Sequence, residues 1–396
     1  MKIKALAYLA AFILPVALSA QDWDSASTQV VAPGVTHKRV VVNSGPWRIN
    51  VLEVDLTQPG VSLHGMRAKD SFIGRETVRS MAARYKGPGK VVGGVNADFF
   101  NVKTGESENN VVIEGNLSKG VTVSDSPYDR FNNLHTEIGF DWNNHPYIER
   151  FGLKGKIMQD SHSVALDGVN FVPPFKDNIE LFTPAVGDSS PQDTLKRKLF
   201  HLPLKFVSRN GNTATYRIAG SVADGERASM ADGGLLVAEG ARTDELRAMA
   251  KRGGTVRVTT ELVPNHGNLR TVVGGWPRIV RNGRSIGEYA DIEEGTFPSF
   301  SSHRHPRTAA GVSKDGHTLY LMAVDGRRES DGGMTLVELA NTMIKLGAYQ
   351  AMNFDGGGST TMVVEGKVVN RPSDDTGERA VGSALLIVAG QGPQRR

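Results

Sequence analysis

The chain contains no cysteine among its 396 residues. This absence excludes disulfide bonds, thiolate metal sites, a cysteine nucleophile and a lipid-modified N-terminal cysteine. Stability must therefore come from the hydrophobic core. With 39% hydrophobic and 22% charged residues, the composition is that of an ordinary globular protein with enough apolar material for a core or two.

The chain also lacks a strong excess of charge of either sign. It has 46 Lys and Arg against 42 Asp and Glu, a formal net charge of +4. The basic residues are scattered, and their densest short run is Lys196-Arg197-Lys198, so we expect no nucleic-acid partner. The mild positive balance favours an anionic substrate, because summed charge draws counter-ions toward clefts.

Long hydrophobic runs are scarce, and the clearest one covers residues 5–17. Lysines precede it and small residues follow it, a pattern typical of a secretory signal peptide over residues 1–20. The alternative is a membrane anchor, but a spanning helix needs about 20 apolar residues, and this run is shorter and contains Pro15. We therefore expect a bacterial periplasmic or secreted protein with no membrane span after signal cleavage.

Short alternating segments and 45 glycines predict a large, strongly sheeted unit. Residues 48–56 alternate with a period near two, as a half-buried strand should. Apolar residues at helical spacing predict helices over residues 77–85, 243–251 and 334–346. We expect an α+β fold with a few packed helices, and a catalytic region over residues 21–396.

Residues 143–209 form the least regular stretch, rich in proline, aspartate and asparagine. This stretch could be an inserted lobe or a long surface excursion over the active site. Regular order returns afterwards, with strands predicted over residues 234–237 and 255–262 on either side of the second predicted helix.

Four polar clusters stand at predicted strand ends or tight loops, where a scaffold usually presents functional groups. They cover residues 96–101, 303–308, 325–331 and 355–359. In the first, Asn96 and Asp98 precede Phe99 and Phe100, which could wall a pocket against water, although such a polar pair is often simple turn chemistry.

The other three clusters combine cations, carboxylates and glycine. Arg307 suits planar recognition of phosphate, and His305 titrates near neutrality; a second nearby histidine could add a metal ligand, but no third ligand is obvious. The cluster from Asp325 could equally be a solvated turn. The three glycines after Asp355 can form an anion-binding nest or a tight structural turn.

The residue types in these clusters suit glycoside chemistry. A glycosidase commonly needs one protonated carboxylic acid and one carboxylate, and a phosphate leaving group also needs cationic groups to hold its charge. Asp98, Asp325 and Asp355 with Arg307 and Arg327 supply that inventory. The three aspartates could equally hold Ca²⁺ or Mg²⁺, which prefer oxygen ligands.

Six ordered stretches carry one resemblance. They are VNADFFN from Val95, GGWPRIVRNGR from Gly274, HPRTAAGVSKDG from His305, VDGRR from Val324, NFDGGGSTTM from Asn353, and NRPSD with GERAVGSALLIV from Asn370. Across most of residues 30–388 the chain resembles the phosphodiester glycosidase family. Trp276 departs from that pattern, because the family more often has a small residue there.

The resemblance implies hydrolysis of the bond between a sugar's anomeric carbon and a phosphate, in a glycan or sugar-phosphate substrate. We predict Asp98, Asp325, Asp355 and Arg307 as catalytic residues. The predicted substrate-binding residues are Asn96, His305, Thr308, Arg327, Gly356, Gly357, Gly358, Ser359 and Arg371. No cofactor is certain, and a divalent cation would bind Asp98, Asp325 and Asp355.

Two other functions remain open from the sequence. One is a glycosidase that cuts ordinary sugar–sugar bonds of an exopolysaccharide or cell-wall glycan. The other is a non-catalytic glycan-binding envelope protein, which has no evident need for three aspartates together.

Overall fold

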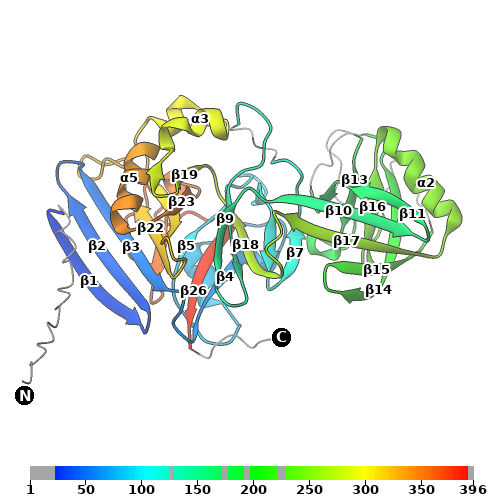
Figure 1. Ribbon diagram of the computed structural model, residues 1–396, viewed down its shortest axis with the longest axis horizontal. Helices are drawn as coiled ribbons and strands as arrows, with labels where there is room; N and C mark the ends of the chain where they lie inside the picture. The colour runs from blue at the N-terminus through cyan, green and yellow to red at the C-terminus, as the bar shows by residue number, and fades with distance from the viewer. Residues whose placement is uncertain are drawn as a thin grey trace, which may run out of the picture.

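The computed structural model describes residues 23–124, 126, 129–171, 177–190, 197–220 and 228–390. The predicted signal peptide over residues 1–20 lies outside this part of the chain. Four β-sheets make up most of the structure. Three of them form a body, and the fourth forms a separate lobe on the right of Figure 1. No helix within the described ranges is long and apolar enough to cross a membrane.

The largest body sheet has eight antiparallel strands in the order β1-β2-β3-β22-β21-β23-β19-β20. Their bounds are β1 (Ser25–Ala32), β2 (Val35–Val42), β3 (Trp47–Asp55), β19 (Arg278–Arg281), β20 (Arg284–Ser285), β21 (Arg307–Val312), β22 (Thr318–Val324) and β23 (Gln350–Asn353). The strand predicted over residues 48–56 is confirmed as β3.

The other two body sheets have five strands each, in the orders β25-β24-β5-β26-β4 and β7-β6-β18-β8-β9. The first contains β4 (Val61–Arg67), β5 (Lys90–Asn96), β24 (Met362–Val364), β25 (Lys367–Val368) and β26 (Ser383–Ala389). The second contains β6 (Val111–Ile113), β7 (Asn116–Lys119), β8 (Glu137–Asp141), β9 (Pro146–Glu149) and β18 (Leu269–Gly274).

One hydrophobic core joins all three body sheets. Leu52, Leu63, Phe140 and Leu385 come from different strands and are all fully buried in it. Burial of each such side chain stabilises the fold by roughly 1.5–3 kcal/mol. The shared core therefore fixes the relative positions of the strand ends that carry the polar clusters.

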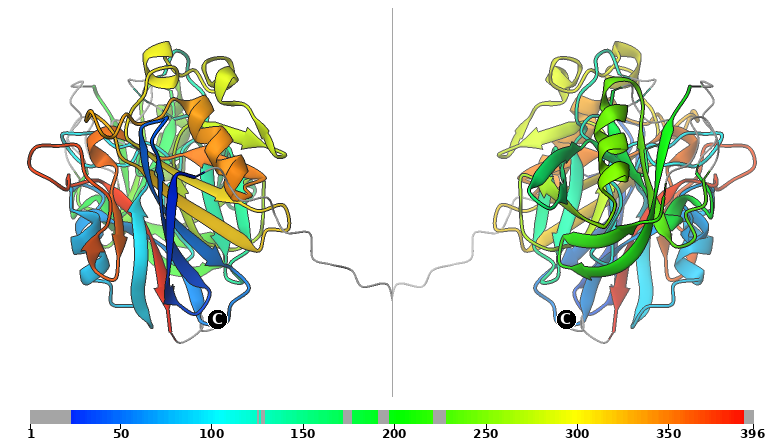
Figure 2. Two further views of the ribbon diagram at one scale, coloured as in Figure 1. Left: turned by 90° about the vertical axis from the view of Figure 1, so that its left-hand side faces the viewer. Right: turned by 90° about the vertical axis from the view of Figure 1, so that its right-hand side faces the viewer.

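Two helices cover the outer faces of the body sheets. Helix α1 (Val78–Ala83) begins at Thr77, whose hydroxyl accepts from the Ser80 amide, and packs on the sheet that contains β5. Helix α5 (Leu336–Leu346) packs on the eight-stranded body sheet, as the left view of Figure 2 shows. The helices predicted over residues 77–85 and 334–346 are confirmed, each with somewhat shorter bounds.

Capping residues fix both ends of helix α5. Thr335 and Glu338 form a capping box at the start, and Gly347 ends the helix with φ 111°. The remaining short helices of the body are η1 (Ala68–Asp70), η4 (Gly287–Tyr289), α3 (Ala290–Glu293), α4 (Pro298–Ser301) and η5 (Gly357–Ser359).

The lobe is an eight-stranded sheet in the order β11-β10-β17-β15-β14-β16-β13-β12. Its elements are β10 (Gly152–Gln159), β11 (His162–Leu166), β12 (Gly168–Val169), β13 (Ile179–Phe182), η2 (Pro184–Val186), β14 (Phe200–Asn210), β15 (Thr213–Ile218), β16 (Gly233–Ala238), η3 (Gly240–Arg242), α2 (Thr243–Arg252) and β17 (Thr255–Val263). Helix α2 lies at the end away from the body (Figures 1 and 2).

The lobe has its own hydrophobic core, in which Leu202, Leu236 and Leu246 are fully buried. The sequence pattern leaves open an inserted lobe or a surface excursion over residues 143–209, and the sheet of the lobe spans residues 152–263. The strands and helix predicted between residues 234 and 262 are confirmed as β16, α2 and β17. The alternation of apolar and polar residues identifies a strand but does not show which sheet the strand joins. The sequence alone therefore could not assign the later strands of the lobe to the lobe rather than to the body.

The expected α+β class fits the structure only roughly. Strands form the whole framework, and the helices are few, short and applied to the outer faces of sheets. A sheet-rich fold with peripheral helices is the more accurate description.

Candidate active site

The glycine loop lies where three distant chain segments meet. Its first residue, Asp355, follows β23, and its amide donates to the Ala97 carbonyl just after β5 (N···O 3.0 Å). The Gly357 amide donates to the carbonyl of Pro306, which precedes β21 (2.9 Å). Gly357 has φ 60°, a left-handed conformation that favours glycine.

Asn96 and Thr308 hold these segments together. The Asn96 amide group donates to the Asp355 carbonyl (2.7 Å), and its oxygen accepts from the Thr308 hydroxyl (2.8 Å) and the Thr361 amide (3.0 Å). Both side chains are buried, with at most 1% exposure. Their polar atoms are thus occupied within the fold, which favours a positioning role over the predicted contact with substrate.

Asp98 is buried behind the loop and is held by one asparagine. Its two carboxylate oxygens accept from the Asn109 side chain (2.6 Å) and the Asn109 backbone amide (3.1 Å). Burial raises the pKa of Asp98 to about 6, although these hydrogen bonds and the charge of Lys119 oppose the shift. Any side chain at Gly274 would collide with Asp98, so the glycine there is required for this packing.

Asp355 is the second carboxyl group of the cluster and is half-buried. Burial raises its pKa to about 6, opposed by hydrogen bonds from Ser359 and from the Gly356 amide (2.8 Å). The negative charge of Asp98 raises the pKa of Asp355 further, so the two carboxyl groups influence each other electrostatically.

Glu108 is a third member of the cluster and is not among the site residues predicted from the sequence. Burial raises its pKa to about 8, and the charges of Asp98 and Asp355 add to that shift. Its amide donates to the Phe99 carbonyl (3.0 Å), which brings it beside the segment after β5. Its Oε2 atom is buried with no hydrogen-bond partner in the described chain. An orphaned buried carboxyl oxygen of this kind calls for a ligand, a water or a functional role.

Two guanidinium groups approach the glycine loop. Arg327, exposed and with φ 63°, lies so close that a Cβ atom at Gly357 would be 2.9 Å from its Nη2. Arg379 makes a two-point ion pair with Asp374 (2.7 and 2.9 Å) and lies against Gly358. Because Gly357 and Gly358 have no side chains, the two guanidinium groups can lie close to the loop. Arg379 stands inside the quoted GERAVGSALLIV stretch but was not among the predicted site residues.

Asp325 lies in a separate carboxylate pair. Its Oδ1 accepts from the Arg371 amide (2.8 Å), and burial raises its pKa to about 6. The neighbouring Asp331 is fully buried and pairs with Arg48 (2.7 Å) and Arg371 (3.4 Å). Arg371 thus binds this pair through both its backbone and its side chain.

The structure places Arg307 and His305 differently from their predicted roles. Arg307 is 1% exposed, and its guanidinium donates to the carbonyls of Met334 (2.9 Å), Phe300 (2.5 Å) and His303 (3.3 Å). Burial lowers the pKa of Arg307 to about 9. The His305 ring contacts the Ser299 carbonyl (3.0 Å). The residue type at position 307 predicted a contact with phosphate. In the structure, the guanidinium of Arg307 donates instead to backbone carbonyls of two loops.

No three Asp, Glu or His side chains converge as a potential metal-binding group within the described residues. Asp98 and Asp355 belong to one cluster and Asp325 to another, so a cation held by all three has no geometric support here. The divalent cation stays a prediction, to be tested with a chelator.

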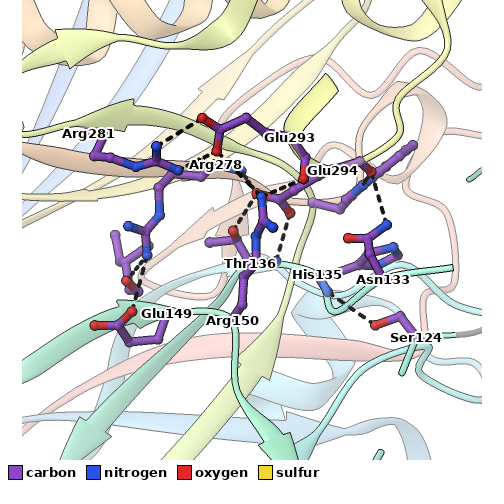
Figure 3. A network of polar contacts seen from close by, with 12 residues as sticks. Ser124, Asn133, His135, Thr136, Glu149, Arg150, Arg278, Arg281, Glu293 and Glu294 are labelled. Carbon is purple, nitrogen blue, oxygen red and sulfur yellow. Dashed lines mark hydrogen bonds and ion pairs between the residues drawn. The ribbon is translucent and has the colours of Figure 1, made fainter. Parts of the chain in front are cut away.

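Figure 3 shows a second polar network, which is centred on Glu294. The buried Glu294 carboxylate accepts from the Thr136 amide (2.9 Å), the Thr136 hydroxyl (2.6 Å) and the Arg278 amide (2.9 Å), and Arg150 lies 3.4 Å away. The Glu294 carbonyl accepts from the Trp276 indole (2.7 Å). Trp276 packs edge-on against Phe99, so this network fixes the tryptophan that departs from the family pattern.

We expect Glu294→Ala to lower the free energy of unfolding by about 3 kcal/mol, because it leaves two buried amides and a hydroxyl without their acceptor. Chemical denaturation measures this loss. Glu288→Ala, an exposed glutamate in the neighbouring η4, is the matched control and should change stability by under about 0.5 kcal/mol. Equal effects of the two substitutions would contradict a structural role for the network.

Residues 210–388 match the family model described as phosphodiester glycosidase. Over this part the chain is similar to the phosphodiester glycosidase family. The match includes three of the four polar clusters and begins inside the lobe. Asp98 and Glu108 lie before its first residue, so their place in the site rests on the structure.

Parts of the chain are also similar to known proteins, and its fold is similar to that of a solved structure. A bovine N-acetylglucosamine-1-phosphodiester alpha-N-acetylglucosaminidase is 32% identical over 42% of this chain and 33% of its own length. An uncharacterised SPbeta prophage-derived protein of Bacillus subtilis is 42% identical over 21% of this chain and 13% of its own length. The alignments thus span a third or less of these relatives. The crystal structure of a hypothetical Synechocystis protein shares the fold over 93% of this chain and 64% of its own, with TM-score 0.74 and 21% identity.

Proposed function

We propose that this protein hydrolyses the bond between the anomeric carbon and the phosphate of a sugar-1-phosphodiester or phosphate-bearing glycan. One observation carries the proposal. The buried Glu108 and the half-buried Asp355 of the glycine loop have pKa values that differ, about 8 for Glu108 and about 6 for Asp355. Such a difference in pKa supports one acid and one base in a glycosidase site.

The roles follow from the protonation states near pH 7. Glu108 is mainly protonated and can donate toward the oxygen that leaves with phosphate. Asp355 is mainly ionised and can accept a proton from the water that attacks the anomeric carbon. Arg327, exposed over the loop and without an ion pair to a described carboxylate, can hold the phosphate charge.

The similarity to a bovine phosphodiester glucosaminidase supports the phosphodiester substrate, and the proposed signal peptide supports a periplasmic or secreted location. The match of residues 210–388 to a glycosidase family model supports catalysis over simple glycan binding. The proposal extends to the substrate class, a phosphate-bearing glycan, and does not name a particular glycan.

Release of free sugar from an N-acetylglucosamine-1-phosphodiester by the mature protein tests the proposal directly. Turnover with the phosphodiester and none with neutral disaccharides is the expected result. Turnover only with neutral disaccharides would replace the proposal by an ordinary glycosidase, and saturable binding without turnover on either class would indicate a glycan-binding protein. A parallel arm with chelator, then with Ca²⁺ or Mg²⁺ restored, shows whether a cation takes part.

We expect kcat/KM to follow a bell-shaped pH profile with limbs near about 6 and about 8, because the free enzyme needs Asp355 ionised and Glu108 protonated. Glu108→Gln should remove the alkaline limb and lower the maximal rate by about a hundredfold. The rate is measured by sugar release between pH 5 and 9, roughly one unit beyond each limb. Glu365→Gln, at an exposed glutamate, is the control and should leave the profile unchanged. An unchanged alkaline limb in Glu108→Gln would remove Glu108 from the acid role.

A further inference from the structure

A cavity of about 450 Å³ lies outside the candidate active site. It borders β4, an edge strand, and also takes residues from the end of α1, the β6–β7 turn, the β8–β9 turn and β18. None of Asp98, Glu108 and Asp355 lines it. Its volume falls in the range of small-molecule sites, roughly 300–1,000 Å³.

Three side chains of this cavity form a relay. Ser62 and His64 are two residues apart on β4, so they share the face opposite to Leu63, which points into the body core. Ser62 Oγ lies 2.9 Å from His64 Nε2. His64 Nδ1 lies 2.6 Å from Glu114 Oε1, in the turn after β6. These are the distances of a nucleophile, its base and the group that orients the base.

The two contacts of the His64 ring are consistent with a role as a general base for Ser62. With its proton on Nδ1, the neutral ring donates to Glu114 and leaves the Nε2 lone pair to accept from the Ser62 hydroxyl. Ser62 and His64 are 5% and 7% exposed, and both line the cavity. A hydroxyl aimed at a held imidazole inside a cavity is the arrangement that activates serine.

Groups that stabilise negative charge stand around the relay. Arg270 is 1% exposed, lines the cavity, donates to Asn144 (2.6 Å) and has no ion pair to a described carboxylate. The Tyr85 hydroxyl lies 3.4 Å from both ring nitrogens of His64. Burial, helped by the charge of Glu114, raises the pKa of Tyr85 to about 12, so it stays a donor at neutral pH. Lys86, exposed at the rim, adds a second cation.

We propose that this cavity is a second hydrolytic site, at which Ser62 and His64 cleave a short-chain carboxylic ester carried by an anionic saccharide. The two cations suit an acidic group, Trp142 and Tyr85 offer aromatic faces to a sugar ring, and the relay suits an acyl carbon. Ser62 and His64 are the catalytic residues, and Glu114 is a positioning residue. The proposal does not depend on the function proposed for the glycine-loop site.

The reaction balances without any cofactor. Ser62 Oγ bonds to the acyl carbon as its proton passes to His64 Nε2, and Arg270 and the Tyr85 hydroxyl stabilise the oxyanion. The bond from the acyl carbon to the alcohol oxygen breaks, and the alcohol leaves with the proton from His64. Water then cleaves the acyl-serine ester by the same route, which releases the carboxylic acid and restores Ser62.

A small alkyl fluorophosphonate is the first probe, because it labels an activated serine whatever the natural alcohol. Peptide mass spectrometry of the labelled full chain should place the adduct on Ser62, and Ser62→Ala should remove it. His64→Gln should slow labelling by about a hundredfold or more. Ser163→Ala, on the exposed face of the lobe, should leave labelling unchanged.

The second measurement is hydrolysis of 4-nitrophenyl acetate. Glu114→Gln, in a half-exposed turn that tolerates change, should lower kcat more than it raises KM, which a purely structural role would not do. Asp355→Asn should leave both labelling and ester hydrolysis intact, so the two sites fail or succeed separately. An unlabelled Ser62 in the wild type, or equal labelling rates in wild type and His64→Gln, would show that the relay is only a structural hydrogen-bond chain.

Discussion

Asp355→Asn should abolish sugar release and at the same time stabilise the protein. Asparagine keeps the shape of the side chain and can still accept from the Gly356 amide, but it cannot take a proton from the attacking water. We expect kcat to fall by about a thousandfold, within the range for removal of a general acid–base group. The loss is read from the initial rate of sugar release at pH 7.

The gain in stability follows from the direction of the pKa shift. Burial raises the pKa of Asp355 to about 6, so the native state binds more protons than the unfolded state above the ordinary pKa of 3.8. The contribution of this group to stability is therefore present at low pH and is lost as pH rises through about 6. At about pH 8 the uncharged asparagine should raise the free energy of unfolding by roughly 2–3 kcal/mol.

Asp375→Asn, an exposed aspartate beyond the loop, is the matched control and should change neither quantity. Chemical denaturation at pH 5 and pH 8, roughly one unit below and two above the native pKa, separates the two contributions. A variant with lower stability and proportionally lower turnover would mean that Asp355 only supports the loop.

Arg307→Ala should act mainly on folding. The substitution removes a buried guanidinium, leaves three backbone carbonyls without their donor and loses the contact of the cation with the Phe300 ring (4.8 Å). Unsatisfied buried acceptors and the cavity together should lower the free energy of unfolding by about 4 kcal/mol. Turnover per folded molecule should change less than about tenfold.

Arg284→Ala, an exposed arginine on β20, is the control for loss of charge and should leave stability nearly unchanged. Arg307→Lys keeps the positive charge but loses the planar guanidinium group. Its free energy of unfolding should lie between those of the wild type and Arg307→Ala. If Arg307→Ala folds normally and loses turnover about a hundredfold, Arg307 contacts the reacting phosphate after all.

Local patterns in the sequence predicted the elements well. The helix over residues 334–346 is found as α5, because its apolar stripe, its capping residues and Gly347 all point to the same element. The glycine loop was also placed correctly after a strand. These features depend on residues within one or two turns of each other.

The carboxyl cluster depends on distant residues and could not be predicted in full. Burial and the charges of Asp98 and Asp355 raise the pKa of Glu108. The residues next to Glu108 in the sequence do not distinguish it from a surface glutamate. Arg307 shows the converse case. Its residue type suggested phosphate, yet the carbonyls that occupy it come from positions 300, 303 and 334 and are invisible to a motif.

The lobe has a further property that follows from where it joins the body. Gly152 at the start of β10 and Val263 at the end of β17 are Cα partners in neighbouring antiparallel strands. The chain therefore departs and returns at a single point, and the body is threaded the same way whether or not the lobe is present. Such a connection lets a domain be gained, lost or exchanged in evolution by one insertion or deletion. It also marks the place where a short hairpin could replace residues 152–263 in an engineered minimal protein.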